Sequence, residues 1–187
     1  MSASNRRFYA GIGSRDTPEH VQEKMTEIAK LLERKRYTLR SGGAIGSDTA
    51  FENGVTANKE IFLTDQYVTI DGVFDYEKED LDFANDAVNK YHPLGKKMKG
   101  DKRKLLARNT FQIFGVGSNT SNSDFVICYT SDGAEAATTK ETGGTGQAIR
   151  IAHDYGIPVY NLKNYIGVTA EEMVEFILKE VANERSK

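Results

Sequence analysis

The chain has 187 residues, of which 39% are hydrophobic and 28% charged, and its formal net charge is −2. These values predict one globular domain over residues 1–187 with a substantial core, and they exclude a global positive field that would attract nucleic acid. No apolar run approaches the roughly 18 residues of a membrane span. The polar segment Met1–Arg7 lacks a signal-peptide core, so we expect a cytoplasmic protein.

The first predicted unit is a strand, a glycine turn and a helix. Phe8–Gly11 has the pattern of a short strand, and Ile12–Arg15 follows it as a turn. Thr17 and Pro18 predict the start of a helix, with a capping hydroxyl before proline at the first helical position. The apolar residues at helical spacing after this start are Val21, Met25, Ile28, Ala29 and Leu32. We expect the helix to end near Arg34–Arg36, whose charges suit a helix C-terminus.

A second unit repeats this order. Tyr37–Arg40 predicts a strand, Ser41–Asp48 a glycine-rich turn, and Ser47 to about Asn53 a short helix. Gly54 is its predicted C-cap. Lys59–Leu63 predicts the next strand.

Residues from about 64 to 100 form a predicted insertion in this single domain. They carry one weak helix, Glu77–Tyr91, and few strong apolar repeats. We therefore expect the insertion to flank a ligand site or to mediate a contact rather than to form core. Lys102–Phe114 predicts a further helix after it.

Two charged blocks lie in and after the insertion. The acidic block consists of Asp71, Asp75, Glu77, Glu79, Asp80, Asp82 and Asp86. The basic block consists of Lys96, Lys97, Lys99, Lys102, Arg103, Lys104 and Arg108. The basic block could contact phosphates, although a run of like charges is more often a solvated face.

The glycine turn Thr142–Gln147 is the most informative stretch of the chain. It follows an apolar run, Asp124–Thr130, that predicts a buried strand, and it leads into Ala148–His153, which predicts a helix. Glycines let the backbone approach a phosphate closely, and the N–H groups and positive dipole end of the helix face such a ligand. The turn is a candidate anion site, with a plain connection between elements as the alternative.

Pro158–Leu162 predicts the last strand, and Thr169–Glu172 predicts a capping box that starts the closing helix. The recurring strand-turn-helix units predict an α/β domain of three layers, with a mostly parallel sheet and helices on both faces. Loops at the carboxyl ends of parallel strands gather on one edge, so the glycine turns can converge on one crevice.

Neither a metal nor a cofactor is expected. Cys128 lies in an apolar strand, where buried packing is its expected role. His20, His92 and His153 lie on different predicted elements without the spacing of metal ligands, and His92 before Pro93 indicates a turn.

Four blocks in order carry a family resemblance: Ile12–Arg15, Ser41–Glu52, Ala107–Asn109 and Thr142–Gln147. Together they resemble the Rossmann-like domain of the DNA-processing protein DprA. The resemblance is greatest to short, single-domain DprA-like proteins often carried by bacteriophages. These belong to the SLOG superfamily, which joins DprA to the LOG nucleotide phosphoribohydrolases. The resemblance spans Phe8 to Leu162.

This resemblance implies a Rossmann-like fold and a pocket that holds nucleic-acid phosphates. The candidate ligand-binding residues are Gly13, Ser14, Arg15, Ser41, Gly42, Gly43, Asp48, Arg108, Asn109, Gly143, Gly144, Thr145 and Gly146. Arg15 and Arg108 can each fork onto a phosphate, with surface ion pairing as the alternative. Asp48 could accept a hydrogen bond from a ribose hydroxyl or could cap its own helix.

The LOG enzymes differ from this chain at their catalytic positions. Their catalytic glutamate falls at Ile149 here, and their arginine-lysine pair is replaced by Arg108 and Asn109. These departures count against phosphoribohydrolase activity. Glu141 and Glu52 are carboxylates near the predicted crevice that could substitute as a general acid.

The resemblance therefore favours binding over catalysis. The expected protein is a cytoplasmic homodimer that holds a nucleotide-type ligand by its phosphates. The ligand could be single-stranded DNA, as for a mediator of DNA recombination, or a free nucleotide or nucleotide-derived signal that a phage would sequester. The alternative is an enzyme that cleaves the N-glycosidic bond of a nucleotide.

Overall fold

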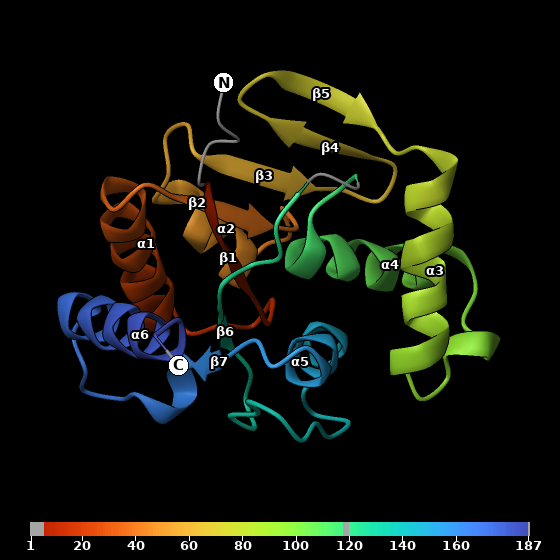
Figure 1. The fold of residues 1–187 in the computed structure, drawn as a ribbon. Coiled ribbons are helices and arrows are strands. Elements are labelled where there is room, and N and C mark those ends of the chain that lie inside the picture. Colours follow the sequence, from red (N-terminus) through yellow and green to blue (C-terminus); the bar gives the residue numbers. More distant parts are fainter. Residues whose placement is uncertain (1–5, 118–119, 187) are drawn as a thin grey trace.

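In the part of the chain that the computed structural model describes, residues 6–117 and 120–186, seven strands form one sheet with helices on both faces (Figure 1). The strands are β1 (Arg7–Gly13), β2 (Tyr37–Ser41), β3 (Lys59–Phe62), β4 (Gln66–Thr69), β5 (Gly72–Asp75), β6 (Val126–Tyr129) and β7 (Val159–Asn161). Their order is β5-β4-β3-β2-β1-β6-β7. All neighbours pair in parallel except β4, which is antiparallel to both β3 and β5.

Two groups of helices cover the sheet. On one face lie α1 (Glu19–Arg34), α2 (Ser47–Asn53) and α6 (Ala170–Glu184), and on the other lie α3 (Lys78–Tyr91), α4 (Gly100–Phe114) and α5 (Thr145–Asp154) (Figure 1). The short 3₁₀ helices are η1 (Gly95–Lys97) and η2 (Leu162–Asn164). None of the helices in the described residues is long and apolar enough to cross a membrane.

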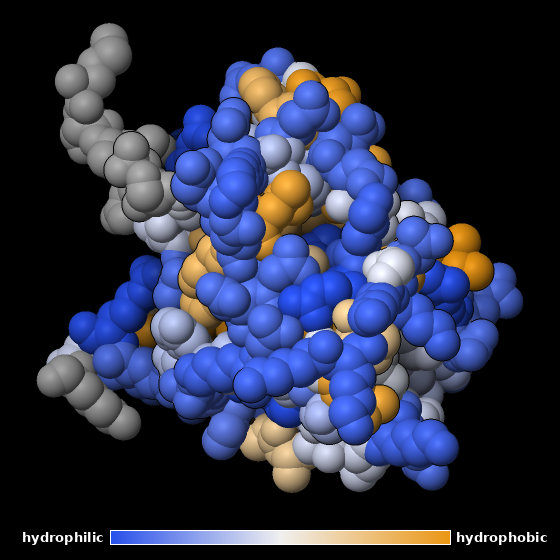
Figure 2. Space-filling view, turned by 90° about the vertical axis from the view of Figure 1, so that its right-hand side faces the viewer, coloured by the Kyte–Doolittle hydropathy of each residue, from blue (hydrophilic) through white to orange (hydrophobic). Residues whose placement is uncertain are grey.

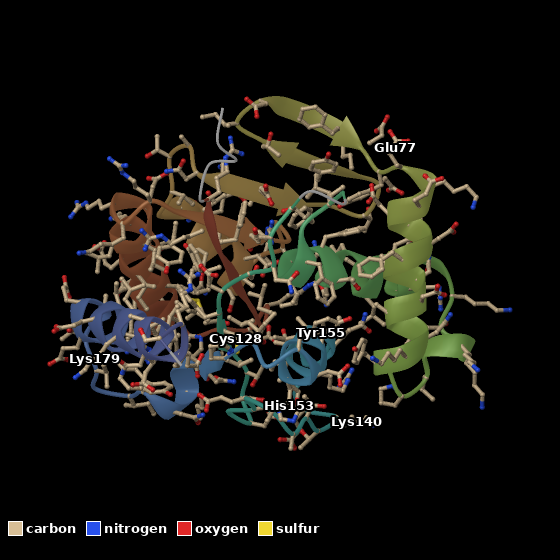
Figure 3. The ribbon with its side chains drawn as sticks, viewed as in Figure 1. Glu77, Cys128, Lys140, His153, Tyr155 and Lys179 are labelled. Atoms are coloured by element: carbon tan, nitrogen blue, oxygen red, sulfur yellow. The ribbon has the colours of Figure 1, made fainter. Side chains whose placement is uncertain are left out.

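Alternation along the strands builds a core on each face of the sheet. Tyr9, Leu39 and Ile127 belong to the cluster shared with α1 and α6, whereas Ala10 and Cys128 pack with α5. Burying each large apolar side chain contributes about 1.5–3 kcal/mol. Figure 3 shows Cys128 in the interior, and its full burial confirms the predicted packing role.

The predicted fold class is confirmed: the domain is α/β, with a mostly parallel sheet between two helical layers. Helix α2 has the predicted bounds and ends at its predicted C-cap, Gly54. The predicted capping box is also present. The Thr169 hydroxyl accepts from the Glu172 N–H at 3.2 Å, and the Glu172 carboxylate accepts from the Thr169 N–H at 2.9 Å.

The expectation that the insertion stays outside the core is wrong. Its first half forms the hairpin β4–β5, which extends the sheet, and α3 buries Ala84 and Val88. Aromatic stacking holds it in place, because the Tyr76 ring lies 4.7 Å from that of Phe111 on α4 and 5.5 Å from that of Tyr67. The insertion therefore packs against α4 through Tyr76 and Phe111.

The predicted cap of α1 is also wrong. The N-cap is Pro18 and no side chain caps this helix. The Thr17 hydroxyl instead donates to the Ser14 carbonyl at 2.8 Å and lies 2.7 Å from the Ser47 hydroxyl. Thr17 thus joins the loop after β1 to α2, because the tertiary hydrogen bonds compete with the local cap.

Candidate functional site

A crevice of about 500 Å³ lies at the carboxyl edge of the sheet, beside the ends of β1 and β6. β1 and β6 flank the topological switch point of the sheet, because β2 to β5 follow on one side of β1, and β6 and β7 on the other. Open α/β sheets bind ligands at such a point. The volume lies within the range of small-molecule sites. The predicted ligand residues that line it are Gly13, Ser14, Arg15, Asp48, Arg108, Asn109, Gly143, Gly144 and Thr145.

The other predicted ligand residues stand behind this lining: Ser41, Gly42, Gly43 and Gly146. Ser41 is fully buried, and its hydroxyl donates to the Gly11 carbonyl at 2.6 Å. A Cβ at Gly42 would lie less than 3 Å from Arg108 and Asp48. Ser41, Gly42 and Gly146 are buried and support the wall, whereas Gly43 is exposed but lies outside the lining.

The loop after β1 is tied to both neighbouring loops. The Ser14 N–H donates to the Tyr129 carbonyl at the end of β6 at 2.9 Å, and the Ser14 carbonyl accepts from the Ser47 N–H at 3.2 Å. Gly13 has a φ of +150°, and a Cβ there would clash with Ser47 and with the Tyr129 carbonyl. Only glycine therefore fits at this point of the crevice.

Arg15 is an exposed cation on the rim of the crevice. Among the described residues it forms neither a hydrogen bond nor an ion pair with another side chain or carbonyl. Its charge helps to stabilise the ionised form of Asp48 in the wall. Because its guanidinium is uncommitted, it is available to bind an oxyanion in bidentate fashion.

Arg108 differs from Arg15, because the protein itself occupies much of its guanidinium. One terminal nitrogen donates to the Gly42 carbonyl, and the other lies 3.7 Å from the Asp48 carboxylate. Its Nε is buried without a partner in the described structure. Arg108 is thus part of a buried ion pair, which neither of the predicted roles described.

Asp48 is the buried carboxylate of the crevice wall. Burial raises the pKa of its carboxyl to about 6, although Arg108 and the backbone N–H of Ala44 favour the charged form. The Ala44 N–H donates to Asp48 Oδ2 at 3.2 Å. Asp48 does not cap α2, whose N-cap is Gly46, and instead it holds the preceding loop.

The glycine turn forms the opposite wall, and α5 begins within it at Thr145 instead of at the predicted Ala148. No side chain caps this helix. The N–H groups of Gly146 and Gln147 donate to the Gly143 and Gly144 carbonyls at 3.1 and 3.4 Å, and Gly144 and Thr145 line the crevice. The positive end of the α5 dipole therefore lies at the crevice. Asn109 of α4 positions the turn, because its Nδ2 donates to the Gly144 carbonyl at 2.9 Å. Gln147 makes a second link, donating from Nε2 to the Leu106 carbonyl at 2.9 Å.

Asp132 organises the loop between β6 and the glycine turn, although no periodic pattern marks it in the sequence. Its carboxylate accepts hydrogen bonds from the hydroxyls of Thr130, Thr139 and Thr142. Burial acts to raise the pKa of Asp132, but these hydrogen bonds outweigh it and hold that pKa at about 2. The loop is therefore fixed by one ionised side chain.

The insertion supplies two lining residues that were not predicted to bind a ligand, His92 and Met98, and the start of α4 supplies Lys102 of the basic block. The His92 ring accepts from the Leu94 N–H at Nδ1, 3.1 Å away, which is consistent with the predicted turn. Burial and the nearby Arg150 lower the pKa of His92. The end of the insertion and the start of α4 therefore border the same crevice as the glycine turns.

The two proposed general acids lie in different places. Glu141 lines the crevice and is exposed, whereas Glu52 lies outside the lining and pairs with Lys59 at 2.8 Å. Within residues 6–117 and 120–186, no cluster of three histidine, cysteine, aspartate or glutamate residues is arranged to hold a metal ion. The crevice is therefore lined by one buried carboxylate, that of Asp48, and by two exposed ones, those of Asp16 and Glu141.

No protein-family model matches the chain, and no curated protein matches it. Among solved structures, it is similar to DNA processing protein A from Helicobacter pylori, which binds single-stranded DNA. The identity is 18%, the TM-score is 0.56, and the match covers 93% of this chain and 81% of that chain. This similarity, together with the sheet topology, shows that the chain has a DprA-like, Rossmann-like α/β fold.

Proposed function

We propose that this protein binds a nucleotide-type ligand, either single-stranded DNA or a free nucleotide, by holding a phosphate in the crevice. One observation carries the proposal: the loop after β1, the start of α5 and the Arg108–Asn109 pair of α4 converge on one cavity of about 500 Å³. Arg15 supplies free donors and the start of α5 its positive dipole end, both suited to an oxyanion, while Arg108 adds positive charge. The likeness to a protein that binds single-stranded DNA supports the same ligand class.

The two arginines have different roles in this proposal. Arg15 makes the first contact with phosphate, because it is exposed and unpaired among the described residues. Arg108 contributes charge from the wall while it stays bonded to Gly42 and Asp48. The ionised Asp48 opposes the binding of an anion. It therefore lowers the affinity for phosphate that Arg15 and Arg108 provide.

The finer features of the proposal follow from the sequence resemblance. The protein acts in the cytoplasm as a homodimeric, phage-type member of the SLOG superfamily. It serves either as a mediator of DNA recombination or as a protein that sequesters a nucleotide signal. Size-exclusion chromatography with light scattering tests the dimer, which a monomeric mass at high concentration would exclude.

Cleavage of an N-glycosidic bond is the second candidate function. It is favoured by one observation, the presence of Glu141 and of the buried Asp48 in the same crevice. A carboxyl with a pKa near 6 can act as a general acid at neutral pH. Release of free base from nucleotides, lost in Glu141→Gln or Asp48→Asn, would establish this activity, and intact nucleotides after long incubation would exclude it.

The binding proposal is tested with fluorescently labelled oligothymidylate at low salt. Arg15→Ala should weaken binding by about tenfold, because a charge-assisted contact is worth about 1.5 kcal/mol. Arg34→Ala is the matched control, since Arg34 is an exposed arginine at the end of α1, away from the crevice. Equal affinities of the two variants, or no binding of any nucleotide or oligonucleotide, would refute the proposal.

A further inference from the structure

The structure divides the basic block into two groups. Arg103, Lys104 and Arg108 are occupied by contacts within the protein. The remaining residues are Lys96, Lys97, Lys99 and Lys102, which are all exposed. Within the described residues, these four form no ion pair, so their charges face solvent. We call them the lysine strip.

The lysine strip is continuous with the crevice. Met98 and Lys102 line the crevice wall, and Lys97 and Lys99 directly flank Met98 in the chain. The strip therefore leads from the cavity along the start of α4 to η1. Figure 2 looks onto the side of the molecule on which α3 lies in Figure 1, and hydrophilic side chains cover most of that face.

Arg103 holds the backbone of the lysine strip against α3. Its guanidinium donates to Asn85 Oδ1 at 2.7 Å, to Asn89 Oδ1 at 3.0 Å and to the Gly95 carbonyl at 2.7 Å. These contacts fix η1 without using the lysine side chains. The strip is thus a set of flexible cationic side chains on a fixed scaffold.

Most residues of the acidic block lie before α3 or in its first half, whereas η1 follows the C-terminal end of α3; Asp86 lies in the second half of the helix. Asp80 accepts from the Gly117 N–H at 3.2 Å, beyond the C-terminus of α4. Figure 3 shows Glu77 at the end of α3 beside the hairpin. The acid nearest in sequence is Asp101, one carboxylate among four lysines. The chain therefore has a basic surface beside the crevice, although its net charge is −2.

We propose that the lysine strip is a second phosphate-binding region, which holds the backbone of a single-stranded nucleic acid while one of its nucleotides occupies the crevice. This inference rests on the proposed function and extends it from one phosphate to several. A phosphodiester chain places an anion at every unit, which suits a row of unpaired lysines better than a free nucleotide does. Leu94, which is 57% exposed beside η1, offers an apolar surface to a base.

The test compares ligands of increasing length on one variant. Lys96, Lys97 and Lys99 are changed together to glutamine, which leaves the crevice lining intact. The matched control changes the exposed Lys35, Lys163 and Lys179, of which Lys179 lies on α6 across the sheet (Figure 3). The ligands are thymidine monophosphate and oligothymidylates of about 4, 8 and 16 nucleotides.

The strip variant should bind thymidine monophosphate as the wild type does and should bind the longest oligonucleotide at least tenfold more weakly. The slope of log affinity against log salt should fall by about 2 for that ligand, since each single-strand phosphate contact contributes about 0.7. The control variant should keep the wild-type slope.

The outcomes separate this inference from the proposed function. If Arg15→Ala weakens every ligand but the strip variant binds the longest oligonucleotide like the control, the strip proposal is wrong and the proposed function stands. If neither mononucleotide nor oligonucleotide binds the wild type, both are wrong. Binding of the strip to phosphatidylserine vesicles, with no dependence on oligonucleotide length, would also overturn it.

Discussion

Two sides of the crevice are each organised by one aspartate, and the two aspartates behave in opposite ways. On the loop side, three threonine hydroxyls hold the pKa of Asp132 at about 2. On the wall formed by α2 and α4, burial raises the pKa of Asp48 to about 6, although Arg108 is 3.7 Å away. The same residue type thus titrates differently, because one carboxylate has short hydrogen bonds and the other has a long ion pair in a buried site.

This difference indicates which side responds to a ligand. The Asp132 loop has satisfied polar groups and serves as a fixed support. The Asp48 wall has an arginine with one unpartnered nitrogen, as judged within the described residues, and a carboxylate that is costly to ionise. A bound phosphate can accept a hydrogen bond from the unpartnered nitrogen of Arg108 in the wall. The Asp132 carboxylate in the loop already has its hydrogen-bond partners.

The largest expected effect is the loss of Arg108. Arg108→Ala leaves Asp48 buried without its cation, so the free energy of unfolding at pH 7 should fall by about 3 kcal/mol. Arg15→Ala, on the rim, should change it by less than about 0.5 kcal/mol. Urea denaturation measures both. A similar loss of unfolding free energy in both variants would contradict the assignment of Arg108 to the buried wall and of Arg15 to the exposed rim.

Asp132→Asn tests the loop side and should lower the free energy of unfolding by about 2 kcal/mol, because the amide cannot accept as many hydroxyl hydrogen bonds. Since the pKa of Asp132 is depressed to about 2, its contribution is present above the unfolded pKa near 4 and is lost as pH falls through about 2. Thermal melts of the variant and the wild type should therefore differ equally at pH 5 and pH 8. A difference that disappears between these two values would contradict the assignment.

Asp48→Asn should act on ligand affinity. It removes the negative charge that opposes phosphate and frees Arg108, so the affinity for oligothymidylate at neutral pH should rise by about tenfold, or about 1.4 kcal/mol. In the wild type, affinity should rise as pH falls through about 6, the pKa of Asp48. His92→Gln is the control, because that ring also gains charge at low pH. A steep pH profile that survives Asp48→Asn but not His92→Gln would refute the role of Asp48.

Ionisation of Asp48 should also affect stability with a definite sign. Because its folded-state pKa is raised, the folded protein binds more protons than the unfolded chain between about pH 4 and 6. Stability contributed by this group is therefore present below pH 4 and is lost as pH rises through about 6. Asp132 has the opposite sign, so the two variants separate the contributions.

A small effect is expected for Asn109→Ala. This change removes the hydrogen bond to the Gly144 carbonyl, which links α4 to the glycine turn at 2.9 Å. The free energy of unfolding should fall by about 1 kcal/mol, while affinity for thymidine monophosphate falls several-fold because the start of α5 loses its support. Isothermal titration calorimetry measures the affinity. An unchanged affinity would show that the turn is positioned without Asn109.

The predictable parts of the fold are those with local patterns. The strand-turn-helix units, the bounds of α2 and the Thr169–Glu172 capping box follow from periodicity and turn residues. The hairpin β4–β5 has only four residues in each strand, too few for a clear alternation. Its position depends on stacking between Tyr76 and Phe111, which are distant in sequence.

The features that no local pattern predicts depend on partners that are irregularly spaced or distant in the sequence. Asp132 acquires its role from threonines at irregular spacing within the loop. Arg40 lies in a strand that was predicted, yet its full burial follows from the Glu60 carboxylate at 2.8 Å and from Thr120, eighty residues later. Such side-chain pairs form only in the tertiary fold, so no periodic pattern in the sequence predicts them.

The most direct test of the anion site is an amide NMR titration of the wild-type protein with thymidine monophosphate. The N–H signals of Gly13 to Arg15 and of Gly143 to Thr145 should shift together with a single dissociation constant, because both segments line one crevice. Shifts confined to other parts of the protein, such as α6 or the hairpin, would contradict the account.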